Sequence, residues 1–86
     1  MPLEKTYKPD VVLDLSGIRC PHLVIATIAA MEKLRAGEIL QLTATDLNGP
    51  SSIAAWARQS NNPLLDMYEE GDQFVFVLKR GLPVTP

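Results

Sequence analysis

Residues 38–45 alternate with a period of two, and this short pattern constrains the fold more than any other feature of the sequence. Leu40, Leu42 and Ala44 fall on one side of an extended chain, and the residues between them fall on the other. Such alternation is typical of a strand with one buried and one open face. The chain is therefore expected to form a sheet that is covered on one side only.

Five further segments surround this strand. Strands are expected over Val11–Leu15, which ends at Ser16-Gly17, and over residues 64–69 and 73–80, which are joined by a tight turn at Gly71. A first helix is expected from Pro21, at its first helical position, to a left-handed cap at Gly37, with its apolar face at Val24, Ile28, Met31 and Leu34 or Arg35. A second helix is expected over residues 50–60, with Ile53, Trp56 and Ala57 inside.

The order β-α-β-α-β-β predicts an α/β (α+β) two-layer sandwich, in which one four-stranded mixed sheet carries both helices on one face. A single domain is expected over residues 1–86, with its core over about 11–80 and a loose tail over 81–86. On the open face, Val75, Val77 and Ile39, with Tyr68 or Met67, are expected near the surface. They would offer a surface for a partner, although scattered exposed valines are also ordinary.

Composition excludes several functional classes. Hydrophobic residues make up 47% of the 86 residues, enough for a core without staples, and one cysteine cannot form an internal disulfide. The net charge of −2 argues against direct nucleic-acid binding. The first ten residues hold no apolar run, so we expect no signal peptide and no membrane span, and a reducing cytoplasm that keeps the thiol free.

The only cysteine and the only histidine stand together in Cys20-Pro21-His22, where the first helix is expected to begin. A thiol at the helix N-cap, or one residue before it, faces free backbone amides that favour the thiolate, and Arg19 adds positive charge. A lone cysteine is also commonly a small buried hydrophobe, and His22 could lie near the sulfur or point into solvent. One cysteine and one histidine cannot form a closed zinc site, and neither a catalytic triad nor a phosphate loop is apparent.

These residues carry a resemblance to a known family. Leu13-Asp14, Gly17, Cys20-Pro21, Gly37-Glu38, Asp46, Ile53, Trp56 and Lys79-Arg80 resemble, in order and spacing, the TusA (SirA-like) family of sulfur carriers. The resemblance implies a two-layer sandwich and a persulfide carried on Cys20. We expect no cofactor, because the cysteine itself would be the carrier, and no metal, because the ligands for one are lacking. The resemblance also implies a donor such as a cysteine desulfurase or a rhodanese-like protein, and a DsrE-like acceptor. The pathways implied are tRNA thiolation, molybdenum-cofactor supply or sulfur oxidation.

The sequence departs from the family at one position. The family pattern is Cys-Pro-x-Pro, and here Leu23 replaces the second proline. Leu23 keeps its backbone N–H, which we expect to be available to the Cys20 thiolate as an additional hydrogen-bond donor. A retuned or lost carrier function is the opposite expectation.

Three functional hypotheses follow from the sequence. The first is a sulfur carrier, or sulfurtransferase, with Cys20 as its reactive residue and Arg19, Pro21, His22 and Leu23 supporting it. The second is a non-catalytic interaction or regulatory module of the same fold, favoured by the altered motif. The third is a redox-sensing thiol, which is disfavoured because the chain has no resolving cysteine.

Overall fold

The computed structural model describes residues 8–19 and 21–81. Its elements follow the expected order: β1 (Val11–Leu15), α1 (His22–Glu32), β2 (Ile39–Ala44), α2 (Gly49–Ser60), β3 (Leu64–Glu70) and β4 (Gln73–Lys79). The strands form one sheet in the order β1-β2-β4-β3. β1 runs parallel to β2, whereas β4 is antiparallel to both β2 and β3. The α+β class and the mixed four-stranded sheet are confirmed.

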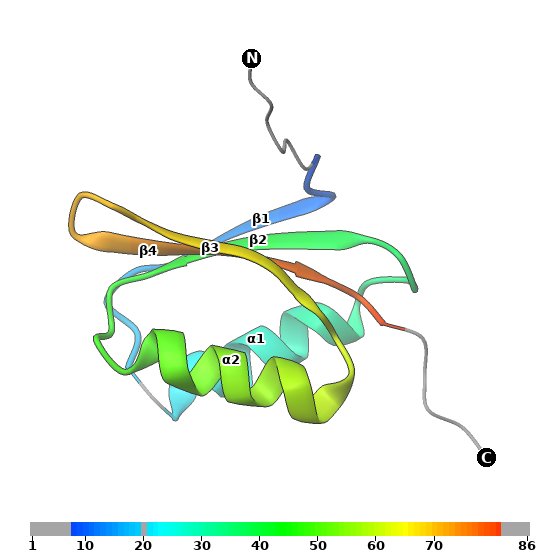
Figure 1. Cartoon of the computed structure of the whole chain (residues 1–86), viewed down its shortest axis with the longest axis horizontal. Coiled ribbons are helices and arrows are strands. Elements are labelled where there is room, and N and C mark those ends of the chain that lie inside the picture. The colour runs from blue at the N-terminus through cyan, green and yellow to red at the C-terminus, as the bar shows by residue number, and fades with distance from the viewer. Residues whose placement is uncertain (1–7, 20, 82–86) are drawn as a thin grey trace.

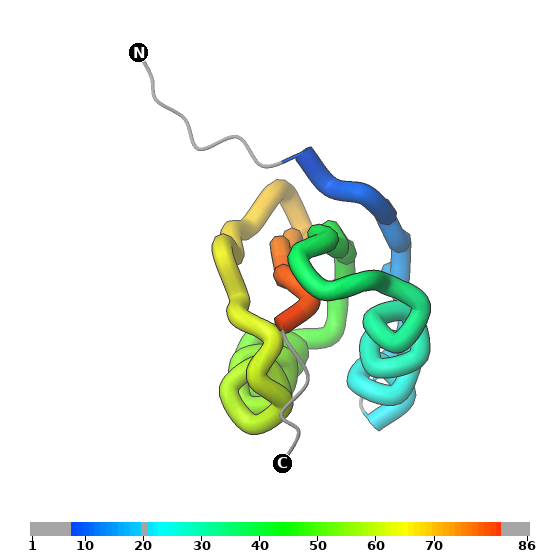
Figure 2. Tube along the Cα trace, turned by 90° about the vertical axis from the view of Figure 1, so that its right-hand side faces the viewer, coloured from blue at the N-terminus to red at the C-terminus, as the bar shows by residue number. Residues whose placement is uncertain are grey.

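Both helices lie on one face of the sheet, so the molecule has two layers (Figure 1). α1 lies beneath the β2 side and α2 beneath β3 and β4, as the end-on view in Figure 2 shows. Neither helix of the described residues has the length and apolar character that a membrane span requires. The layer formed by the two helices covers only the sheet face to which Leu40, Leu42 and Ala44 point, as the alternation of β2 predicts.

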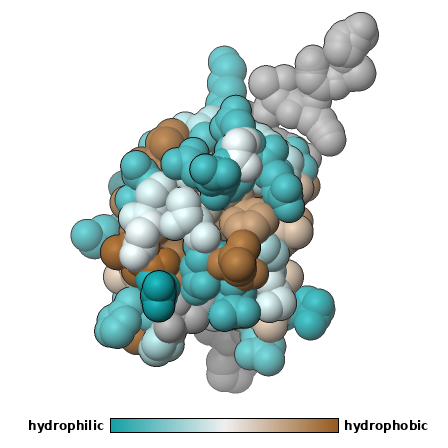
Figure 3. Space-filling view, turned by 90° about the vertical axis from the view of Figure 1, so that its left-hand side faces the viewer, coloured by the Kyte–Doolittle hydropathy of each residue, from teal (hydrophilic) through white to brown (hydrophobic). Residues whose placement is uncertain are grey.

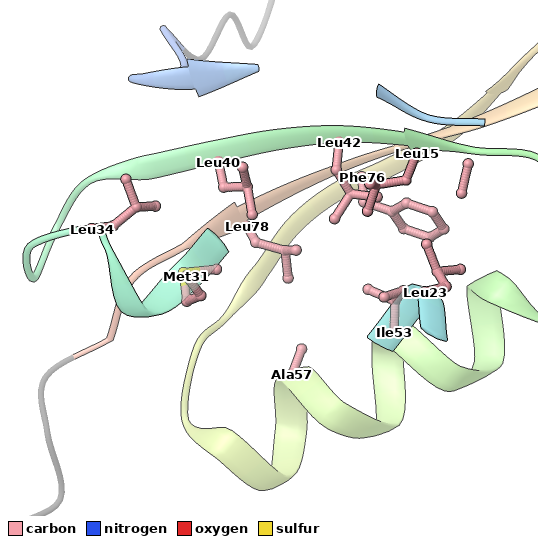
Figure 4. Packing of buried hydrophobic residues seen from close by; sticks show 11 residues of the cluster. Leu15, Leu23, Met31, Leu34, Leu40, Leu42, Ile53, Ala57, Phe76 and Leu78 are labelled. Carbon is pink, nitrogen blue, oxygen red and sulfur yellow. The ribbon is translucent and has the colours of Figure 1, made fainter. Parts of the chain in front are cut away.

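The core lies between the sheet and the helices (Figure 4). It is built by inward side chains of β1, β2 and β4, by one stripe of each helix and by one residue just after α1, namely Leu15, Leu23, Met31, Leu34, Leu40, Leu42, Ala44, Ile53, Ala57, Phe76 and Leu78. Trp56 is partly buried against this cluster, which agrees with the expected inner face of α2. Burial of these apolar side chains is the main stabilising term of a domain of this size.

The buried face of α1 differs from the expected one. Leu23, Thr27 and Met31 are buried, whereas Val24 and Ile28 are only partly so. Thr27 tolerates complete burial because its hydroxyl donates a 2.8 Å hydrogen bond to the Leu23 carbonyl. The buried stripe of α1 is therefore shifted by about one residue from the expected one. The difference arises because Thr27, a polar residue by its sequence, can be buried once its hydroxyl is hydrogen-bonded.

Both ends of α1 also differ from the prediction. The helix begins at His22, with Pro21 as its N-cap, because the Pro21 carbonyl accepts the 3.1 Å bond from the Ile25 amide. It ends at Glu32, and the 3.0 Å bond from the Leu34 amide to the Met31 carbonyl tightens the following turn. This turn brings Leu34 into the core, so Gly37 lies in a separate turn before β2 and does not cap the helix.

The open face of the sheet is less exposed than expected. Val75 and Val77 are only 2% and 4% exposed, because β4 is a central strand and both valines lie between outward side chains of β2 and β3. Met67 and Tyr68, on the edge strand β3, are 42% and 43% exposed. The expectation of surface valines was therefore wrong, and Ile39 is half-buried. Tyr68 pairs with Val75 and is exposed on the open face as expected, whereas Met67 pairs with Phe76 and belongs to the helix-covered face.

Candidate functional site

The turn after β1 is fixed by the side chain of Asp14. The Ser16 hydroxyl and amide both donate to Asp14 Oδ1, at 2.6 and 3.0 Å. These bonds, the hydroxyl bond above all, lower the pKa of the Asp14 carboxyl below its ordinary value because they stabilise the carboxylate. The Asp14 carboxylate thus holds the turn that leads to Cys20.

Two further bonds fasten this turn to other strands. The Gly17 amide donates to Thr45 Oγ1, just beyond β2, at 2.8 Å. Gly17 has a φ of 84°, which a residue with a side chain adopts only with strain. The Gln73 side chain, at the start of β4, donates to Ser16 Oγ at 3.2 Å. The segment that precedes Cys20 is therefore tied to Thr45 and Gln73, which both lie on the inner side of the edge strand β1.

Cys20 itself lies outside the described residues, which resume at Pro21. Its chain position places it immediately before the N-cap of α1, the second of the two positions expected from the sequence. The flanking residues Arg19 and Pro21 are both exposed. His22, the first residue of the helix, is exposed as well, and its side chain makes no hydrogen bond with any described residue. A chemical role for His22 stays a prediction.

Leu23 has a structural role that was not expected from the sequence. Its amide donates a 2.9 Å hydrogen bond to the Arg19 carbonyl, which closes a turn of chain across positions 20–22. The amide is therefore engaged by the backbone, whereas the expected bond to a Cys20 thiolate involves a residue outside the described ones and stays a prediction. The Leu23 side chain is fully buried in the core. A proline at this position could form neither the hydrogen bond nor the same packing.

A cleft of about 620 Å³ opens beside this turn. It is lined by Gly17, Ile18 and Arg19 on one side and by Thr45, Asp46, Leu47 and Asn48 on the other. The second side is the loop between β2 and α2, in which Asp46 Oδ1 accepts the Asn48 amide at 3.1 Å and the Asp46 carbonyl accepts the Gly49 amide at 2.9 Å. Leu47 is 84% exposed, and Figure 3 shows this end of the molecule, where apolar and polar side chains are interspersed.

Thr45, Leu47 and Asn48 were not expected at a functional site from the sequence. A usable signal was present, since β1 and β2 are neighbouring parallel strands and the loops after such strands meet at one edge of the sheet. Arg19 and Asp46 are far apart in the sequence, with α1 and β2 between them, yet they line the same cleft. The arrangement places the start of α1 next to an open recess that a second molecule can enter.

Comparison with known proteins identifies the family. The family model described as sulfurtransferase TusA matches residues 11–80, from the first residue of β1 to the residue after β4. The chain belongs to the TusA family. The match covers the whole two-layer fold, the turn around Cys20 and the loop beyond β2.

Several curated proteins are similar to this chain. The candidate sulfur carrier protein YrkI of Bacillus subtilis is 36% identical over 86% of this chain and 99% of its own length. The sulfur carrier protein TusA of Allochromatium vinosum is 32% identical over 84% of this chain and 95% of its own length. A candidate sulfur carrier protein of Aquifex aeolicus is 37% identical over 90% of this chain, and this match covers 39% of that longer protein.

Proposed function

We propose that this protein is a sulfur carrier that holds sulfane sulfur as a persulfide on Cys20. The observation that carries the proposal is the match of residues 11–80 to the sulfurtransferase TusA family, together with relatives that are named as sulfur carriers over nearly their whole length. The single cysteine of the chain falls inside this match and is the only thiol that can carry the sulfur.

Loading is a displacement at sulfur. The Cys20 thiolate attacks the outer sulfur of a donor persulfide, a new bond forms between Cys20 Sγ and that sulfur, and the donor's sulfur–sulfur bond breaks. The donor cysteine leaves as a thiolate, so no external oxidant or reductant is needed. Unloading repeats the same displacement, with an acceptor thiolate attacking the outer sulfur on Cys20.

The surroundings of Cys20 suit this exchange. The flanking Arg19 and Pro21 are exposed, and the adjacent cleft carries Ile18 and the highly exposed Leu47 as contacts for a protein surface. The Arg19 guanidinium is a source of positive charge for the transferred persulfide anion. The bond from the Leu23 amide to the Arg19 carbonyl joins the residues that follow Cys20 to the residue before it, and Pro21 is the N-cap of α1. His22 is the candidate proton donor or acceptor for the thiol.

The partners proposed are those that the family suggests. A cysteine desulfurase or a rhodanese-like protein would load Cys20, and a DsrE-like protein would accept the sulfur in the cytoplasm. tRNA thiolation, molybdenum-cofactor supply and sulfur oxidation are the candidate destinations. The reaction needs no cofactor, because the cysteine itself is the carrier.

Intact mass measurement tests this proposal. The protein is incubated with a cysteine desulfurase and cysteine, and separately with polysulfide, and we expect a gain of one sulfur atom that dithiothreitol removes. The Cys20→Ser variant is the matched control and should gain none. Absence of the adduct with every donor would refute the carrier function and leave the interaction module as the better reading. Oxygen adducts with peroxide, without sulfur adducts, would favour a redox sensor.

A further inference from the structure

We propose that the end of the molecule remote from the Cys20 turn binds an acidic segment of a partner protein. A second cleft, of about 450 Å³, opens at this end. It is lined by Ala36 and Gly37 before β2, Asn61 and Pro63 after α2, and Lys79, Arg80 and Gly81 at the end of β4. Figure 2 faces this end and shows the first two segments on either side of the last one.

The three segments are joined by short backbone bonds. The Gly37 amide donates to the Arg80 carbonyl, and the Arg80 amide donates to the Glu38 carbonyl, both at 2.8 Å. On the other side, the Lys79 amide donates to the Pro63 carbonyl at 2.9 Å. The cleft is therefore a fixed part of the sheet end and needs no rearrangement of its backbone to form.

A buried asparagine side chain completes this frame. Asn62 is only 5% exposed, and its Oδ1 accepts the Gly81 amide at 2.7 Å while its Nδ2 donates to Ser60 Oγ at 3.0 Å. A Cβ added at Gly81 would collide with the Asn61 carbonyl, so the two segments are in direct contact. A preformed site of this kind loses little conformational entropy when it binds a ligand.

The cations around this cleft lack partners within the described part of the chain. Lys79 and Arg80 line it, and Lys33 and Arg35 precede the segment that forms its wall. None of these four residues forms an ion pair with a described residue. Two carboxylates lie at the same end, and both accept backbone amides at 2.8 Å: Glu38 from Arg35, and Asp10 from Ile39. The cleft thus presents positive charge that a carboxylate-bearing ligand would neutralise.

The negative charge at the opposite end of the molecule favours a short acidic peptide over a long polyanion as the ligand. Glu69, Glu70 and Asp72 are exposed around the turn between β3 and β4, at the end that also carries the Cys20 turn. The six residues of β2 separate the two ends by about 20 Å. A long polyanion such as RNA would therefore meet negative charge as it extends over this molecule, whereas a short acidic peptide can be confined to the positive end.

The test is a titration of the ¹⁵N-labelled protein with a blocked penta-glutamate peptide, followed through backbone amide shifts. We expect saturable shifts confined to residues 35–38, 61–62 and 79–81, which disappear at high salt. A blocked penta-glutamine peptide should cause none. The Arg80→Gln variant should weaken binding about fivefold, because it removes one ion pair and leaves the backbone bonds intact. Arg19→Gln, with the same charge loss at the opposite end, should leave the affinity unchanged.

Several results would overturn the proposal. Equal shifts with the glutamine peptide, or equal weakening by Arg19→Gln, would show that the charge of this cleft does not direct binding. Tighter binding of inorganic phosphate would identify a small-oxyanion site, and tighter binding of an oligouridylate would identify a nucleic-acid surface. Because the titration does not use the thiol, it can be repeated in Cys20→Ser, where the carrier function is absent and the peptide should still bind.

Discussion

Replacing Leu23 with proline removes one backbone hydrogen bond and alters one fully buried side chain, and both effects can be sized from the structure. The 2.9 Å bond from the Leu23 amide to the Arg19 carbonyl contributes about 1 kcal/mol, since the exposed Arg19 can bond water instead. The poorer fit of proline in the core costs about 1–2 kcal/mol more. A stiffer unfolded chain offsets up to about 1 kcal/mol, and the first helical turn accepts proline.

The net expectation for Leu23→Pro is a loss of about 1–2 kcal/mol, which lowers the urea midpoint by about 1–2 M for a domain of this size. Leu23→Ala is the matched control: it keeps the amide but removes most of the side chain, and it should cost about 2–5 kcal/mol. If Leu23→Pro lost more unfolding free energy than Leu23→Ala, the reasoning would be refuted. Such a result would show that the main cost is a helix start that cannot accept proline, and not the loss of side-chain packing.

The same variant tests the chemistry of Cys20. Because the Leu23 amide is bonded to the Arg19 carbonyl, its removal should leave the pH dependence of Cys20 alkylation unchanged. The measurement is the rate of reaction with iodoacetamide across a pH series, in the native protein and in Leu23→Pro. A midpoint that moves to higher pH in the proline variant would refute this reasoning, since it would show that the amide does stabilise the thiolate.

Three further predictions concern the ends of the sheet. Because the folded pKa of Asp14 is lowered, its stabilising effect is present at neutral pH and lost as the pH falls below about 4; urea midpoints of the native protein and Asp14→Asn should therefore differ at pH 7 and converge in acid. Thr45→Val removes the acceptor of the Gly17 amide, so this amide should exchange its hydrogen faster, with a loss of about 1 kcal/mol; unchanged exchange would contradict the tether. Gly81→Ala collides with the Asn61 backbone and should cost about 1–3 kcal/mol by urea unfolding, whereas a neutral effect would mean that this end yields easily.

The order of the elements follows from the sequence because its signals are local. The period of two in β2 places Leu40, Leu42 and Ala44 in the core without knowledge of their neighbours. Asn48-Gly49-Pro50 marks the start of α2 for an equally local reason, since proline suits the first turn of a helix. Such features depend on the backbone of a few residues, so they can be predicted without knowledge of the tertiary contacts.

The residues whose burial was predicted wrongly are those whose burial depends on hydrogen bonds and strand neighbours. Thr27 is buried because its hydroxyl bonds to its own helix, and Val75 is buried because β4 lies between two strands. Neither fact can be read from hydrophobic periodicity. The cleft beside Cys20 is a similar case, since it forms only when the loop at Asp46 is brought next to Arg19 by the parallel pairing of β1 and β2.

Leucine at position 23, where the family motif has its second proline, has a structural role. A proline at this position would leave the Arg19 carbonyl without its intramolecular donor, whereas leucine supplies the donor and also fills the core. The described residues before Cys20 are fastened by the bonds of Ser16 and Gly17, and the helix start after it is fastened by the buried side chain of Leu23. A loop held at both ends keeps a reacting group in a narrow range of positions, which lowers the entropic cost of meeting a partner thiol. Leucine at this position therefore restrains the chain by a hydrogen bond where proline would do so by its ring, and in the proposed carrier this bond would hold the residues on which Cys20 is mounted.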